Sequence, residues 1–152
     1  MFYDLITNLS LVIPFCAWVI AQLIKTLAAL ARGEGFDFSY FISSGGMPSA
    51  HSATVSALAT AVAMIDGFGS TTFAISAVLA LIVMYDAAGI RQSVGQQSIV
   101  LNRIMRELRE KQPLIKIEED LRELVGHTPF QVFAGCILGI AIAWLWLFLA
   151  GV

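Results

Sequence analysis

Three long stretches without a charged residue constrain this chain more than any other feature of its sequence. They are Leu5–Ile24, Gly67–Tyr85 and Thr128–Val152, each long enough for about five helical turns or more. Each stretch can therefore cross a hydrocarbon core of about 30 Å. Charged residues make up 13% of the chain, about half their share in a soluble domain. We expect an integral membrane protein.

A fourth helix is expected at Ser49–Ile65, which is shorter than the three stretches and rich in Ala, Ser and Thr. Small residues let helices approach closely, so this helix should pack against the others rather than face lipid. The first helix is expected from about Tyr3 to Arg32, with a kink at Pro14. The predicted fold class is an all-α membrane bundle of about four transmembrane helices, formed by residues 1–152 as one membrane-embedded domain.

The stretch from Arg91 to Arg122 is polar and holds most of the chain's nine Lys and Arg residues. It also holds acidic residues, so it is not a nucleic-acid-binding patch. Apolar residues recur among the charges of Ser93–Lys111, which predicts an amphipathic helix on the membrane surface. A short helix is expected around Ile117–Val125. The positive-inside rule places this stretch in the cytoplasm, and the size of the chain favours a bacterial inner membrane.

In a four-helix serpentine, the ends of the first and third helices and the starts of the second and fourth lie on one membrane face. Nearly every ionisable residue near a predicted span lies at one of these four places. Charges near a bilayer are costly and usually mark a functional site. The sequence therefore predicts one polar site on the cytoplasmic side, formed by Lys25, Arg32, His51, Asp86, Arg91 and His127.

The segment from Gly45 to Ser52 reads Gly-Gly-Met-Pro-Ser-Ala-His-Ser and leads into the helix expected at Ser49–Ile65, the second along the chain. The first N–H groups of a helix lack partners within the helix and carry a positive partial charge, so a phosphate can bind there. His51 lies in this first turn, where it can exchange a proton near neutral pH. Because the rest of the chain is apolar, the phosphate is expected to belong to a lipid.

Three motifs resemble those of the type 2 phosphatidic acid phosphatase superfamily, which also includes the vanadium haloperoxidases. Lys25 and Arg32 have the spacing of the first motif, although Gly33 replaces its proline. Pro48-Ser49-Ala50-His51 is similar to the second motif, Pro-Ser-Gly-His. In the third motif only the histidine matches, as His127. These motifs, with Tyr85–Arg91, resemble the divergent branch of the superfamily.

The resemblance implies phosphoryl transfer through a phosphohistidine, with no metal and no cofactor. His127 would attack phosphorus and His51 would protonate the leaving alkoxide. The phosphoryl oxygens would be held by Lys25, Arg32, Gly45, Gly46, Ser49 and Arg91.

The histidine nucleophile also needs an acceptor for its second ring nitrogen. Gln131 stands at or near the position where the family has an aspartate, and Thr128-x-x-Gln131 is also a helix capping box. An amide accepts a hydrogen bond but does not stabilise an imidazolium as a carboxylate does. We therefore expect Asp86, on the same membrane face, to replace the missing carboxylate.

The leading function is hydrolysis of a lipid phosphate or diphosphate ester, with phosphatidate-like lipids and polyprenyl phosphates both open as substrates. The alternative is a protein that binds lipid phosphates without cleaving them, as a transporter, flippase or scaffold. A haloperoxidase is disfavoured, because nothing in the sequence supplies a channel for an oxidant.

Two further features concern packing. Gly135-x-x-x-Gly139 favours close helix contact and leaves a homodimer open. Cys16 and Cys136 lie within apolar spans, and we interpret both as packing residues.

Overall fold

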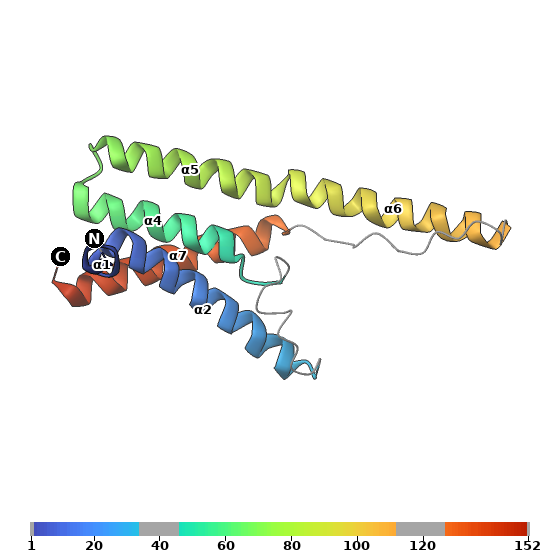
Figure 1. The fold of residues 1–152 in the computed structure, drawn as a ribbon, viewed down its shortest axis with the longest axis horizontal. Coiled ribbons are helices and arrows are strands. Elements are labelled where there is room, and N and C mark those ends of the chain that lie inside the picture. The colour runs from blue at the N-terminus through green and yellow to red at the C-terminus, as the bar shows by residue number, and fades with distance from the viewer. Residues whose placement is uncertain (1, 34–45, 112–126, 152) are drawn as a thin grey trace.

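The protein was examined as a computed structural model that describes residues 2–33, 46–111 and 127–151. In these three ranges the regular secondary structure is entirely α-helical, which confirms the predicted fold class (Figure 1). Helices α2, α5 and α7 are long and apolar enough to cross a membrane. The helices are α1 (Phe2–Thr7), α2 (Leu9–Ala31), α4 (Ala50–Asp66), α5 (Thr71–Ala88), α6 (Ile90–Lys111) and α7 (Pro129–Ala150).

Helix α4 is the centre of the bundle and packs against α2, α5 and α7. It has 17 residues, which corresponds to a length of about 25 Å. Ala53, Ala57 and Ala61 are fully buried along it. The prediction that this helix packs against its neighbours is confirmed. The bundle thus holds three helices of full spanning length around one shorter, small-residue helix.

Two glycines of α7 make the contact with α4 close. A Cβ atom added at Gly135 would collide with the carbonyl oxygen of Ser49, and one added at Gly139 would collide with that of Ala53. Ser56 reinforces the same seam, since its hydroxyl lies 3.1 Å from the carbonyl oxygen of Cys136. The close contact predicted for Gly135-x-x-x-Gly139 is therefore made within one chain, and the homodimer stays a prediction.

The first predicted helix is divided in two. Asn8 separates α1 from α2 as the N-cap of α2, and its Oδ1 accepts a hydrogen bond of 3.0 Å from the N–H of Ser10. The helix is continuous through Pro14, and the kink expected there stays a prediction. An asparagine side chain competes for backbone N–H groups and favours a helix start.

Helix α6 begins directly after Gly89 and continues in roughly the direction of α5, beyond the ends of α4 and α7 (Figure 1). It confirms the helix expected at Ser93–Lys111 and begins three residues earlier. Its position on the membrane surface stays a prediction. The short helix expected around Ile117–Val125 lies outside the described residues.

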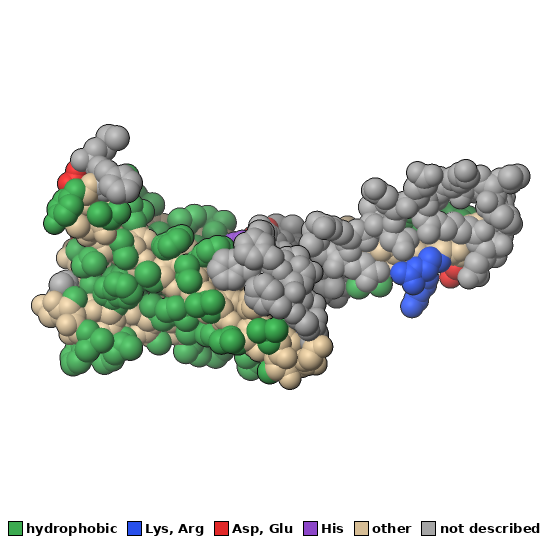
Figure 2. Space-filling model, turned by 60° about the horizontal axis from the view of Figure 1, so that its bottom comes forward, with side chains coloured by type: hydrophobic (Ala, Val, Ile, Leu, Met, Phe, Trp, Pro, Cys, Tyr) green, Lys and Arg blue, Asp and Glu red, His purple; other side chains and the backbone are tan. Residues whose placement is uncertain are grey.

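Different parts of the chain lie at the two ends of the bundle. The chain termini and the turn between α4 and α5 lie at one end, and the starts of α4 and α7 lie toward the other, where α5 passes into α6 (Figure 1). Figure 2 shows mostly hydrophobic side chains over the bundle, with described charged side chains near the two extremes of the molecule. The helices α2, α4, α5 and α7 thus alternate in direction as expected, while a membrane crossing by α4 stays a prediction.

Candidate functional site

Two histidines far apart in the sequence meet at the α6 end of the bundle. The ring centroids of His51 and His127 are 6.3 Å apart, with the ring planes at 61°. His51 is the second residue of α4, and His127 lies two residues before α7. His127 is buried and His51 is half-buried. The structure thus brings the two rings close together, while their shared pocket and their roles stay predictions.

The start of α4 is fixed to the start of α7 by Ser49. This residue is the N-cap of α4, and its Oγ accepts hydrogen bonds from the N–H of Ser52 at 3.3 Å and from the Ser52 hydroxyl at 3.0 Å. Its own N–H donates to the carbonyl oxygen of Gln131, 3.1 Å away. The helix N-terminus that carries His51 is therefore held in register with the helix that follows His127.

His127 is oriented by Gln131. The Nδ1 atom of His127 lies 3.3 Å from Oε1 of Gln131, and the same oxygen accepts a hydrogen bond of 3.0 Å from the N–H of Thr128. The Thr128 hydroxyl accepts in return from the N–H of Gln131, which completes the predicted capping box. Because that oxygen only accepts, the contact requires the proton of neutral His127 on Nδ1. Nε2 is then the unprotonated, nucleophilic nitrogen, and it is buried.

A buried cation lies beside the loop that precedes α4. Lys25 of α2 is 6% exposed, and a Cβ atom added at Gly46 would lie 3.7 Å from its Cδ. The backbone of Gly46 has φ of +86°, a conformation that favours glycine. Lys25 and Gly46 are thus brought together next to the N-terminus of α4, as the sequence predicts.

The other predicted site residues are placed only by their position along the chain. Arg32 is the exposed C-cap of α2, about 10 Å along the helix from Lys25. Asp86 is half-buried near the end of α5. Arg91 is the second residue of α6, and Gly45 lies outside the described residues. The roles of these four residues, Arg32, Asp86, Arg91 and Gly45, stay predictions.

Sequence reasoning missed one buried amide. Gln22 is 4% exposed, and its Oε1 is buried without a hydrogen-bond partner in the structure. It lies three residues before Lys25, so both occupy the same face of α2. The sequence feature that could have pointed to Gln22 is a polar amide within a long apolar run that has no charged residue. Asn102 of α6 is also buried, with 1% of its surface exposed.

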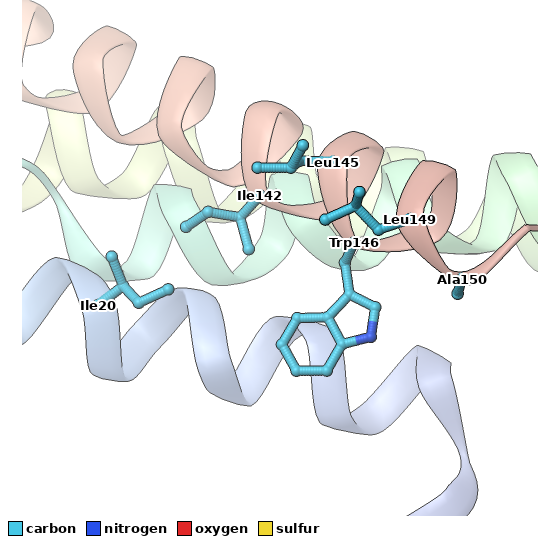
Figure 3. A pocket seen from close by; sticks show the side chains of 6 residues that line it. All are labelled: Ile20, Ile142, Leu145, Trp146, Leu149 and Ala150. Atoms are coloured by element: carbon cyan, nitrogen blue, oxygen red, sulfur yellow. The ribbon is translucent and has the colours of Figure 1, made fainter.

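An apolar groove runs along the seam between α2 and α7, with a volume of about 460 Å³ (Figure 3). Trp146 points from α7 toward α2. One helical turn nearer to the histidines, Leu138 of α7 packs against the buried cluster of Ala21, Ala50 and Ala53. The groove begins at Ile20 and Ile142 and runs along α7 away from the histidines, to Ala150 at the end of the bundle that holds the chain termini. Its lining residues are Ile20, Ile142, Leu145, Trp146, Leu149 and Ala150.

Comparison with known proteins agrees with the motifs. The family model described as the divergent PAP2 family matches residues 6–142. The chain is similar to the uncharacterized membrane protein YuiD of Bacillus subtilis (strain 168), with 39% identity over 148 residues that cover 91% of this chain and 94% of the relative. No solved structure matches.

Proposed function

This chain belongs to the divergent PAP2 family, and on that premise we propose that it is a membrane phosphatase that hydrolyses the phosphate or diphosphate ester of a lipid. The observation that carries the proposal is the pair of imidazole rings 6.3 Å apart at the start of two neighbouring helices. His51 lies in the first turn of α4, and the buried Lys25 lies beside Gly46 in the loop that leads into this helix. Together these groups provide a nucleophile, an acid and an anion site.

The proposed reaction has two steps. First, Nε2 of His127 attacks phosphorus while the bond from phosphorus to the lipid oxygen breaks, and protonated His51 gives its proton to that oxygen. Water then attacks the phosphohistidine, and His51, now neutral, takes a proton from this water. Inorganic phosphate leaves and His127 is restored. Both steps use ordinary acid–base and nucleophilic chemistry of imidazole.

Charge stabilisation is the main task of the remaining groups. A phosphoryl group carries negative charge on its oxygens through the transition state, so fixed cations and N–H dipoles accelerate its transfer. Lys25 and the N-terminal turn of α4 fill this role, with Ser49 and Gly46 beside the phosphate. We assign Arg32, Arg91 and Gly45 to the same task, and Asp86 to stabilising the imidazolium of His127.

The substrate is assigned to lipids from the position of the site. His127 lies two residues before the membrane-spanning helix α7, and the groove between α2 and α7 offers an apolar surface for a hydrocarbon chain farther along the same helix (Figure 3). The basic residues after α5 favour a cytoplasmic opening of the site. We propose the cytoplasmic membrane of a bacterium as its location.

One observation favours a second function. The acceptor beside His127 is the neutral amide of Gln131, where a carboxylate would stabilise the imidazolium better. A protein that binds lipid phosphates without cleaving them, such as a transporter, flippase or scaffold, would not need that carboxylate. Lipid binding without turnover would support this alternative.

Phosphate release in detergent micelles separates the two functions. The panel comprises phosphatidate, lysophosphatidate, and a polyprenyl phosphate and diphosphate, each with and without a chelator. Hydrolysis predicts release by the wild type and its loss in both His51→Ala and His127→Ala. Thr60→Val is a suitable control, since its hydroxyl only bonds to the carbonyl oxygen of Ser56 in the same helix, at 2.8 Å. Binding of these lipids without release of phosphate from any of them would overturn the proposal that the protein is a phosphatase.

A covalent intermediate gives an independent test. Lipid carrying a labelled phosphate should transfer label to the wild-type protein during turnover. The label should be absent from His127→Ala, because that variant lacks the attacking nitrogen. Label that persists in His127→Ala would contradict the assignment of the nucleophile.

A further inference from the structure

The amide of Gln22 is buried with its acceptor unused. Its side chain is 4% exposed, and its Oε1 accepts no hydrogen bond from the residues that the structure describes. The one hydroxyl close by in sequence, that of Thr26, donates instead to the backbone carbonyl of Gln22 at 3.0 Å. Buried polar atoms are nearly always paired, and the bilayer offers no water to compensate. The atom is therefore positioned to accept a hydrogen bond from a group that binds to the protein.

The location of Gln22 connects it to the candidate site. It shares one face of α2 with Lys25, three residues later. The adjacent Ala21 packs against Ala50 and Ala53 in the first turn of α4, so Gln22 lies level with the helix start that carries His51. Since α2 runs toward the site, Gln22 is about one helical turn nearer the membrane interior than Lys25.

We propose that Gln22 is a specificity-determining residue whose Oε1 accepts a hydrogen bond from a hydroxyl or amine on the substrate. The inference rests on the proposed function. An ionised phosphate held at Lys25 and the histidines offers acceptors, so the donor must come from the part of the lipid between the phosphate and the hydrocarbon chain. That part lies on the interior side of the phosphate, where Gln22 is.

The inference selects among the lipid classes that the sequence leaves open. A monoacyl glycerol phosphate, or another lipid with a free hydroxyl or amine beside its phosphate, provides the donor. A polyprenyl phosphate and a diacyl phosphatidate have no such donor, so binding them would leave the amide oxygen buried and unpaired. A site built to accept a substrate hydroxyl discriminates strongly against an analogue that lacks it.

A matched pair of substrates tests the inference with the full-length protein in micelles. The first is oleoyl lysophosphatidate, and the second is its 2-deoxy analogue, in which hydrogen replaces the free hydroxyl. The wild type should prefer the hydroxylated lipid by about tenfold in kcat/KM. Gln22→Met, which has similar size and no strong acceptor, should lower the rate on that lipid to the level of the deoxy analogue. Thr26→Val should keep the preference.

Each outcome is decisive. Equal rates of the wild type on both lipids would overturn the inference while the phosphatase stands, and so would a preference retained by Gln22→Met. No release from either lipid, or from the panel above, would overturn the phosphatase and this inference with it. If Gln22→Met does not fold, Gln22→Asn withdraws the acceptor by one methylene and should lose the same preference.

Discussion

The contact between α4 and α7 at Gly135 gives a prediction with a worked magnitude. In Gly135→Ala the new methyl group would collide with the carbonyl oxygen of Ser49 and lie 3.0 Å from Cβ of Ser52. The first of these neighbours is backbone, so the two helices must separate, and overpacking of this kind costs ~3 kcal/mol at its upper end. Alanine regains about 1 kcal/mol through its higher helix propensity. The net loss in the free energy of unfolding is therefore about 2 kcal/mol.

Thermal unfolding in detergent measures this loss. For a chain of this size, a loss of about 2 kcal/mol lowers Tm by roughly 4–8 °C. The matched control is Gly69→Ala, because an added Cβ there meets no atom within 4 Å and the backbone needs no left-handed conformation. That variant should be as stable as the wild type. The same displacement moves Ser49 relative to Gln131, so turnover by Gly135→Ala should also fall, on the order of a hundredfold for a shift of about 1 Å.

The oligomeric state separates this explanation from the homodimer reading. If Gly135 contacts α4 of its own chain, Gly135→Ala loses stability without a change in the mass of the particle in solution. A wild-type dimer that becomes a monomer in Gly135→Ala at unchanged Tm would refute the reasoning.

Further predictions concern the site chemistry. Gln131→Leu removes part of the helix cap, so it should lose about 1 kcal/mol of stability in thermal unfolding and at least tenfold in the rate of phosphate release. Gln131→Glu should raise the rate of phosphate release above that of the wild type. Lys25→Met should weaken substrate binding, seen as a raised KM in a titration with lipid phosphate. The pH profile of kcat/KM should be bell-shaped around neutral pH, because His127 must be neutral while His51 is protonated, and a flat profile between pH 5 and 9 would contradict this pairing. Asp86→Asn should lower turnover while Tm is unchanged, and wild-type rates in that variant would eliminate Asp86 as the carboxylate.

Much of the fold could be predicted because the constraint on it is simple. Uncharged stretches long enough to span a bilayer must be helices, and successive crossings of a bilayer must alternate in direction. This alternation alone brings His51 and His127, which are 76 positions apart, to the same end of the bundle. The small residues of α4 likewise predicted its position between its neighbours.

Other features depend on contacts in three dimensions that cannot be predicted from the sequence alone. The division of the first helix at Asn8 was not predicted, because an asparagine within an apolar run starts a new helix only when its side chain accepts from the backbone, as it does here from Ser10. The capping box at Gln131 was predicted, but its second contact, with His127, depends on the angle at which the chain enters α7. Gln22 went unnoticed because an unused acceptor is visible only when all its neighbours are known.

The central position of α4 has a consequence for biosynthesis. The segment that carries His51 is short and weakly apolar, so on its own it enters a bilayer poorly. The N–H of Ser49, at the start of this segment, donates to the carbonyl oxygen of Gln131. Gln131 is synthesised more than eighty residues later. A newly made chain therefore cannot bring His51 and His127 together until the last helix is in place.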